Sequence, residues 1–339
     1  MPNPRWTRRP EGSNWGDFGP DDQRGRINLL TPERTKRAAQ EIKEGISFCL
    51  SLPLTLPGKQ VLNNRRKPPQ FHGVDRDGHV SFDLPLNAIN PMHTDVNCDD
   101  AVTLYLQYST QWDSLCHIGS HFDADGDGTA ERVYYNGWNV RDPKTGKPVY
   151  GDVGAYALGI QNMAESGVTG RGVLIDLHAH YGEVRHAVNY DDLMRIMAQD
   201  KVVVEEGDMV LLHTGLGQMI VDMKGDPDPK LRTACPVLDS TDKRILDWVR
   251  DSGLVILAAD NLAVEQSTQL PREMHECGPA LPLHELCLFK LGIHLGELWY
   301  LTELARWLRA HGRSRFFLTA PPLRLPGAVG SPATPVATV

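Results

Sequence analysis

The chain has 339 residues, of which 41% are hydrophobic and 23% are charged, as in an ordinary globular enzyme. Its formal net charge of −8 argues against a nucleic-acid partner, because nucleic-acid-binding surfaces usually cluster Lys and Arg on one face. The six cysteines are scattered without a Cys-x-x-Cys pair, which excludes a disulfide framework and a zinc ribbon.

The N-terminus lacks the apolar stretch of a signal peptide, and no segment resembles a membrane span, so we expect a cytoplasmic protein that binds no membrane. Residues 1–30 are rich in Gly, Pro, Asp and Trp and predict an irregular N-terminal arm. A helix is expected to follow the N-cap Thr31 and to end near residue 43. The alternating run Ile46–Leu54 predicts a strand. Residues 57–96 are polar and too long for a simple connection, so we expect a functional flap or an oligomer arm.

Beyond this arm, short apolar runs alternate with segments of helical character. Strands are predicted at 102–109, 172–177, 208–214 and 254–260, and helices at 191–199, 240–252 and 298–310. This alternation indicates an α/β fold with a mixed central sheet. Because we find no internal repeat and no break in composition, residues 31–319 are expected to form a single catalytic domain. The Pro-, Ala- and Gly-rich residues 320–339 are expected to be a flexible tail.

Several nucleotide and nucleophile motifs are absent from the sequence. There is no Gly-x-Gly-x-x-Gly after a strand, no phosphate-binding loop ending in Lys-Ser/Thr, and no Gly-x-Ser-x-Gly elbow. Nucleotide-dependent chemistry and serine-hydrolase chemistry are therefore disfavoured. A hydrolase with this sequence would need a metal or a water molecule activated by His.

Two segments carry His, carboxylate and amide side chains at the ends of apolar runs. Asp113 and His117 follow one predicted strand, and His284 and Glu297 lie at the ends of two later apolar segments. Metal-assisted hydrolysis needs a metal held by His and carboxylates, an open position for water, and a base for the proton of that water. A single His or carboxylate of this kind more often has a structural role, but the four residues together indicate a metal-assisted hydrolytic site.

As a set, these segments resemble the cyclase family that includes bacterial kynurenine formamidases, isatin hydrolases and trans-dienelactone hydrolases. The resemblance covers nearly the whole chain and is carried by residues 15–17, 22–33, 135–137, 207–215, 259–265, 282–284 and 295–297. It implies a swivelling β/β/α fold, with a central mixed sheet or barrel-like core flanked by helices. It also implies a homo-oligomer that acts on a small-molecule substrate.

The family's central signature is His-x-Gly-Thr-His-x-Asp-x-Pro-x-His, in which two His and the Asp bind metal. This chain departs from it, because Gln107 and Gln111 stand at the two His positions when Asp113 is aligned. An amide oxygen is a weaker ligand than imidazole for zinc, so among Mn, Mg and Zn the harder ions should be favoured. The resemblance implies His117 as the catalytic acid/base and, as metal ligands, Asp113, His284, Glu297, Gln111 and Gln107.

A second alignment frame is possible ten residues further on. The segment His117-Ile-Gly-Ser-His121-Phe-Asp123 also reproduces His-x-Gly-Thr/Ser-His-x-Asp, and it would make His121 and Asp123 metal ligands. We favour the first frame because it keeps the strand-to-motif distance and the terminal His. In the first frame, residues 118–133 are an insertion.

The insertion contains its own candidate ion site. Asp123, Asp125 and Asp127 precede Gly128 and open a calcium-loop pattern, although Tyr134 replaces the Glu expected at its twelfth position. The alternative is a solvated acidic turn.

Two further signals surround the main segments. Trp112 is expected to be a substrate-binding wall of the pocket, with core packing as the competing interpretation. His178 and His180 follow a strand, and we expect a structural or substrate-facing role for them rather than metal binding.

The function implied by the resemblance is hydrolysis of a C–N amide or lactone bond in a small cyclic or aromatic metabolite. Metal-activated water would attack and His117 would move the proton, as in an arylformamidase of tryptophan catabolism. Two other classes remain open. One is a metal-independent cyclase or lyase of secondary metabolism that uses His117 with Asp113. The other is a metabolite-binding protein with a degenerate metal site.

Overall fold

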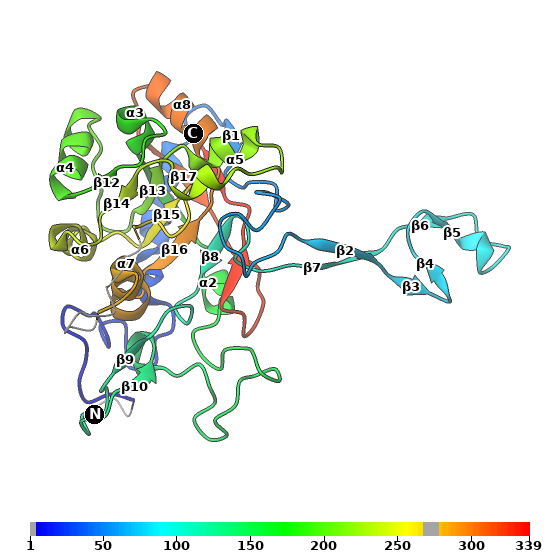
Figure 1. The fold of residues 1–339 in the computed structure, drawn as a ribbon, viewed down its shortest axis with the longest axis horizontal. Coiled ribbons are helices and arrows are strands. Elements are labelled where there is room, and N and C mark those ends of the chain that lie inside the picture. Colours follow the sequence, from blue (N-terminus) through cyan, green and yellow to red (C-terminus); the bar gives the residue numbers. More distant parts are fainter. Residues whose placement is uncertain (1–4, 267–277) are drawn as a thin grey trace.

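The computed structural model describes residues 5–266 and 278–339 (Figure 1). A curled nine-stranded sheet forms its centre, in the order β1-β19-β17-β11-β13-β15-β16-β8-β18. The strands are β1 (Ser47–Cys49), β8 (Gln111–Asp113), β11 (Thr169–Asp176), β13 (Met209–His213), β15 (Ile256–Ala259), β16 (His294–Glu297), β17 (Arg315–Thr319), β18 (Gly330–Pro332) and β19 (Val336–Thr338). Strands β11, β13, β15 and β16 pair in parallel and the others pair antiparallel, so the mixed central sheet of an α/β fold is confirmed.

Helices flank the curled sheet. They are α1 (Pro32–Ala38), α2 (Gln161–Glu165), α3 (Leu177–Tyr181), α4 (Tyr190–Gln199), α5 (Leu216–Asp222), α6 (Lys243–Asp251), α7 (Pro282–His284) and α8 (Thr302–Ala310), with a π-helix at Glu285–Leu291. The expected N-cap of the first helix is present, because the Thr31 hydroxyl accepts a hydrogen bond from the backbone N–H of Arg34. None of the helices in the described ranges combines the length and apolar character that crossing a membrane requires.

The two faces of the sheet support two apolar clusters because successive side chains of a strand point in opposite directions. In β11, Val173 and Ile175 join the cluster that contains Leu193 of α4 and Ile245 of α6. Their neighbour Leu174 joins the cluster on the other face, which includes residues of α8. Every residue of β13 is buried, as expected of a parallel strand covered on both faces.

The segment expected at 57–96 to be a flap or an oligomer arm matches its prediction only in part, because a long ribbon that leaves the body of the molecule begins at residue 70 and extends to residue 103 (Figure 1). At its root, β2 (Gln70–Gly73) pairs with β7 (Asp100–Thr103). Beyond them lie two smaller hairpins, β3 (Asp75–Arg76) with β4 (His79–Val80) and β5 (Leu84–Pro85) with β6 (Val96–Asn97). None of these strands belongs to the central sheet.

The remaining short strands lie outside the central sheet as well. β9 (Ser120–Phe122) pairs with β10 (Glu131–Val133), so the expected insertion 118–133 is a hairpin. β12 (Ala187–Val188) pairs with β14 (Val237–Leu238). The strand predicted at 102–109 is wrong in its extent: β7 ends at Thr103, and a turn separates it from β8. That turn redirects the chain from the arm into the sheet.

The flexible tail predicted from residue 320 is wrong. Strand β18 pairs with β8, and β19 lies between β1 and β17, so the last twenty residues complete the central sheet. Ala333, Ala337 and Val339 are buried. Small residues, which suggested disorder by composition, allow this segment to fit closely against the sheet and its neighbours.

Candidate active site

The pairing of β8 with β16 brings the first two candidate residues together. Gln111 lies opposite Glu297 in the antiparallel register, and Asp113 lies opposite Leu295. Gln111 and Asp113 are two residues apart, so both side chains point to the same face of the sheet. The Gln111 amide Nε2 donates a hydrogen bond of 2.9 Å to Glu297 Oε2.

Trp112 occupies the opposite face, which corrects its prediction as a pocket wall. Its side chain is fully buried, and its ring meets Trp299 edge-on at a centroid distance of 4.9 Å. The indole Nε1 donates to the backbone oxygen of Ala320 over 2.8 Å. Strand alternation is the reason, because a side chain between Gln111 and Asp113 must point away from theirs. Trp112 therefore supports the strand from behind.

His284 is oriented by a buried glutamate. One oxygen of Glu265 accepts hydrogen bonds from the backbone N–H and the Nδ1 of His284, at 2.9 and 2.8 Å, and the other accepts from the backbone N–H of Leu283. Glu265 thereby caps the start of α7 and holds the imidazole ring. The opposite ring nitrogen, Nε2, lies 3.2 Å from Glu297 Oε1. A carboxylate that holds the outer nitrogen of a His is the usual support of a metal-binding His.

Asp113, His284 and Glu297 converge on one buried point. One potential ligand atom from each lies within 4.8 Å of the other two. Within the described ranges, neither oxygen of the Asp113 carboxyl has a hydrogen-bond partner, and the Gln111 Oε1 also has none. Buried polar atoms normally have partners. These three oxygens are therefore free to bind an ion or a ligand that is not part of the protein chain.

The electrostatics of the cluster follow from this arrangement. Burial raises the pKa of Asp113, because desolvation penalises its charged form. Burial opposes the charge of His284 as well, but the hydrogen bonds to Glu265 and Glu297 outweigh it and raise the pKa of His284 to about 10. For Glu297, the hydrogen bond and the charge of His284 outweigh desolvation and lower its pKa. The two ring nitrogens of His284 thus each face a glutamate, Nδ1 facing Glu265 and Nε2 facing Glu297.

The donor set fits a divalent cation. Carboxylate oxygens of Asp113 and Glu297, the imidazole Nε2 of His284 and the free Oε1 of Gln111 offer three kinds of ligand atom around one point. A shell rich in oxygen suits Mn²⁺ or Mg²⁺ better than Zn²⁺.

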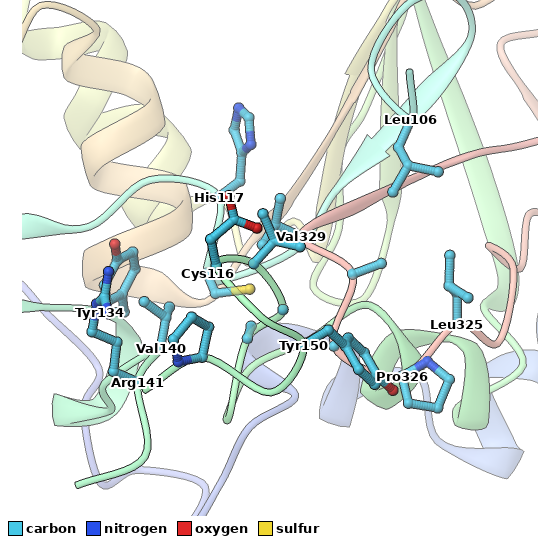
Figure 2. A pocket seen from close by; sticks show the side chains of 17 residues that line it. Leu106, Cys116, His117, Tyr134, Val140, Arg141, Tyr150, Leu325, Pro326 and Val329 are labelled. Atoms are coloured by element: carbon cyan, nitrogen blue, oxygen red, sulfur yellow. The ribbon is translucent and has the colours of Figure 1, made fainter. Parts of the chain in front are cut away.

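His117 connects this cluster to a cavity. Its Nε2 lies 3.7 Å from Asp113 Oδ1, and its side chain is 20% exposed. The same residue lines a cavity of about 540 Å³ (Figure 2). Figure 2 shows Tyr134, Val140 and Arg141 on one side of Cys116, and Tyr150, Leu325 and Pro326 on the other. The cavity walls are thus mainly apolar, and His117 lies between them and the carboxylates.

Comparison with known proteins places this geometry in a family. The sequence profile of the family described as "Putative cyclase" matches residues 49–266, which is more than half of the chain. The chain belongs to the cyclase family. A solved structure described as a novel cyclase is 32% identical over 96% of this chain and 97% of its own, with a TM-score of 0.75. No curated protein matches the chain.

Isatin hydrolases share the cyclase-family fold at greater distance. Isatin hydrolase A from Ralstonia solanacearum is 15% identical, covers 91% of this chain and 96% of its own, and has a TM-score of 0.55. Isatin hydrolase A from Labrenzia aggregata, bound to benzyl benzoate, is 13% identical over 89% of this chain and 95% of its own, with a TM-score of 0.53. The curled mixed sheet with flanking helices is therefore the family's fold, as the resemblance implied.

The second alignment frame of the family signature is not assembled. His121 is exposed on the β9–β10 hairpin, where it lies opposite Arg132. Asp123 accepts hydrogen bonds from Arg8 and from the backbone N–H groups of Gly126 and Gly128. Neither residue belongs to the group formed by Asp113, His284 and Glu297, so the first frame accounts for the buried group.

The calcium-loop prediction needs one correction. Asp123 and Asp125 approach Glu131, and Asp127 is not part of this group. The Asp127 carboxylate instead accepts a hydrogen bond from the backbone N–H of Thr129. The hairpin turn therefore folds onto its own backbone and onto Arg8, as a solvated acidic turn does.

Gln107 takes a different position from Gln111. Its Nε2 is buried and has no hydrogen-bond partner among the described residues, and it lies beside Gly330 of β18. Its backbone oxygen accepts a hydrogen bond of 2.7 Å from Arg66 Nη1. Of the two glutamines that replace the family's His pair, Gln111 is thus the one that contacts a residue of the cluster.

The sequence interpretation missed two residues of this site. Glu265 lies in the segment 259–265 that carried the family resemblance, but its spacing from His284 does not indicate that the two residues are in contact. Arg66 belongs to a short basic cluster and adds positive charge that lowers the pKa of Glu297 and opposes the rise at Asp113. His178 and His180 lie on α3, where the His180 Nε2 meets Asp200 at 2.9 Å, so they take no part in the cluster.

Proposed function

We propose that this protein is a metal-dependent hydrolase that cleaves a C–N amide or a lactone bond in a small cyclic or aromatic metabolite. The observation that carries the proposal is the buried Asp113 carboxyl, which lacks a hydrogen-bond partner in the described part of the chain. It lies beside His284, Glu297 and His117. Four such groups around one point are the components of metal-assisted hydrolysis.

The proposed metal ligands are Asp113, His284, Glu297 and Gln111. A divalent cation held there would polarise the substrate carbonyl and acidify a bound water. Glu265 keeps the His284 Nε2 directed at the cluster, and Gln111 steadies Glu297 through its amide N–H. These contacts restrict the orientation of two ligands before any substrate arrives.

His117 is the proposed acid/base. It lines the cavity on one side and faces the Asp113 carboxyl on the other, so its ring is within reach of both water and substrate. It would take a proton from the attacking water and then give it to the leaving nitrogen or oxygen. The neighbouring Asp113 carboxylate would stabilise the imidazolium between these two steps.

The apolar cavity suits the ring of such a substrate. Side chains of Val140, Tyr150, Val153 and Leu325 offer contact surface without charge. Isatin hydrolases, which share the fold, act by name on isatin, a small aromatic ring with a cyclic amide. This similarity supports a ring-shaped amide or lactone over an open, charged substrate.

The test is a hydrolysis panel of aryl formamides, cyclic aryl amides and lactones, run after chelation and after addition of Mn²⁺, Mg²⁺ or Zn²⁺. We expect turnover of at least one class, restored best by Mn²⁺ or Mg²⁺ and absent with chelator. Turnover that is unaffected by chelation would instead support the metal-independent cyclase or lyase. Thermal stabilisation by panel compounds without any turnover would support a binding protein.

A further inference from the structure

A second cavity adjoins the one beside His117. It has a volume of about 600 Å³, and Tyr134, Val140 and Arg141 line both cavities. Figure 2 shows these three residues grouped on one side of Cys116. The two cavities thus share one wall, and a molecule bound beside His117 can extend along this wall toward the second cavity.

The second cavity differs from the first in the character of its lining. Glu131, Arg132 and Asn139 belong to it, whereas the first cavity is lined mainly by apolar side chains. Its polar residues come from strand β10 and from the loop that follows Trp138. The second cavity is therefore suited to a polar group and the first to an apolar one.

Strand alternation directs the Arg132 side chain away from the core. Arg132 lies between Glu131 and Val133 in β10, so its side chain points to the face opposite theirs. Val133 is buried in the core, and the Glu131 Oε1 accepts a hydrogen bond of 3.0 Å from the backbone N–H of Ala124. The Glu131 carboxylate is thus engaged inside the hairpin, and the Arg132 guanidinium lies on the other face.

Two guanidinium groups without carboxylate partners meet at the second cavity. Within the described part of the chain, Arg132 makes neither an ion pair nor a hydrogen bond, and Arg141 donates one hydrogen bond of 3.1 Å to the backbone oxygen of Gly146. Burial raises the pKa of Tyr134, and the positive charges of both Arg132 and Arg141 oppose this rise, so both groups act on the same side chain. Asp152 lines the first cavity but not the second.

An acidic group is the ligand that two such guanidinium groups recognise. Arg presents its N–H groups in a planar fork that matches two oxygens of a carboxylate or a phosphate. Hydrogen bonds in which both partners are charged are stronger than those between neutral groups. The lining of the two cavities therefore fits a molecule with an apolar ring at one end and an acid at the other.

We propose that the second cavity binds an acidic tail, a carboxylate or a phosphate, of the molecule whose ring occupies the cavity beside His117. Arg132 and Arg141 hold the tail, and Asn139 offers a neutral hydrogen-bonding side chain beside them. The substrate is then a cyclic or aromatic amide or lactone that carries an acidic side chain. That the tail belongs to a substrate rests on the proposed function, whereas the binding of an acid by the two arginines does not.

Isothermal titration calorimetry with compounds that contain no amide or lactone tests the site. The probes are phenylalkanoates of increasing chain length, the matching phenylalkyl phosphonates in place of phosphates, and the neutral phenylalkanols of the same lengths. At one length, we expect an acid to bind at least about tenfold more tightly than its alcohol. This preference should weaken as salt rises. The acid that binds more tightly, carboxylate or phosphonate, identifies the group.

Variants of the two arginines locate the site. Arg132→Gln and Arg141→Gln should each reduce the preference for the acid by at least about threefold, and the double variant should abolish it. Arg132→Lys keeps the charge but loses the planar fork, so it should retain part of the preference. The matched control, Arg306→Gln, removes an exposed Arg of α8, which lies far from the β9–β10 hairpin (Figure 1), and should leave the preference unchanged.

The titrations use protein treated with chelator, because a metal ion at the Asp113 cluster would also bind an acid. The proposal is overturned if no acid binds more tightly than its alcohol, or if the preference appears only when metal is added. Survival of the preference in the double variant would overturn it as well. None of these titrations needs turnover, so a failed hydrolysis panel would refute the proposed function without affecting their result.

Discussion

Asp113 combines complete burial with two unpaired oxygens, and this combination sets it apart from the other carboxylates of the site. Glu265 and Glu297 both have hydrogen-bond partners that offset the free energy of their burial. A buried acceptor without a partner costs roughly 1–3 kcal/mol of stability. Binding of the metal ion proposed above would offset this cost.

Asp113→Asn tests whether the buried Asp113 carboxyl lowers the stability of the fold. In protein treated with chelator, we expect the variant to be more stable by about 1–3 kcal/mol, because an amide avoids the penalty of a buried charge. Added Mn²⁺ should raise the Tm of the wild type but not that of the variant. Urea unfolding and thermal melts measure both effects. A variant that melts lower than the wild type without metal would contradict this explanation.

His117→Ala tests the acid/base assignment. On a substrate found by the panel, we expect kcat to fall by about 10²–10⁴, because a positioned proton donor and acceptor is lost. The control is His121→Ala, which removes the exposed His of the β9–β10 hairpin and should leave kcat within about twofold of the wild type. An equal fall in kcat for the two variants would contradict the assignment of His117 and would favour the second alignment frame.

His284 predicts a pH dependence of stability. Its pKa in the folded protein is raised from 6.5 to about 10, so its charged form stabilises the fold. This contribution is fully present below about pH 6.5 and is lost as the pH rises toward about 10. With chelator present, the free energy of unfolding should fall across this window, and His284→Asn should flatten the slope. A wild-type slope equal to that of the variant would show that His284 is not charged in the folded protein.

At the scale of the element, β8 is the critical strand although it has only three residues. It lies between β16 and β18, so its position depends on the last part of the chain. One of its faces carries Gln111 and Asp113, and the other carries Trp112, which packs on Trp299. The face with Gln111 and Asp113 is therefore held in place by the core behind it and by the C-terminal segment beside it.

Ala337→Asp tests the structural role of this segment. Ala337 is buried in β19, and an unpaired charge there should cost about 3–5 kcal/mol of stability. The neighbouring Val336 is partly exposed on the same strand, and Val336→Asp should cost less than about 1 kcal/mol. Urea unfolding separates the two variants. Similar small effects for both would mean that β19 does not pack against the sheet in solution.

At the scale of the whole molecule, the curled sheet and the arm are separate parts. All nine strands of the sheet come from outside residues 70–103. The body has two large apolar clusters of its own, one on each face of the sheet. We therefore expect the body to fold without the arm.

Replacing residues 71–102 with a short Gly/Ser linker tests this separation. Gln70 and Thr103 are direct partners in the β2–β7 ladder, so a short linker can join them. At concentrations where both proteins are monomeric, the variant should be as stable as the wild type or more stable by about 1 kcal/mol, because a shorter loop costs less closure entropy. Loss of the cooperative unfolding transition would show that the arm is part of the folding unit.

The sequence by itself determined the class of fold and most residues of the site. Apolar periodicity is a local property, so the strands at β11, β13 and β15 and the helices at α4 and α6 were predicted near their observed positions. The family resemblance rested on side-chain types at fixed spacing, and these pointed to Asp113, His117, His284 and Glu297. The position of Trp112 on the face opposite to Gln111 and Asp113 could also have been predicted, because side chains alternate along a strand.

Only the tertiary structure decided the rest, because strand pairing joins residues that are distant in sequence. The small residues of 320–339 have little periodicity, and their order comes from ladders with β1, β8 and β17. Gln111, and not Gln107, contacts the cluster because the β8–β16 register places Gln111 opposite Glu297. The support of His284 by Glu265 is evident only in the folded protein, where the start of α7 lies against the Glu265 carboxylate. Local sequence encodes which side chains are available, and non-local pairing decides which of them meet.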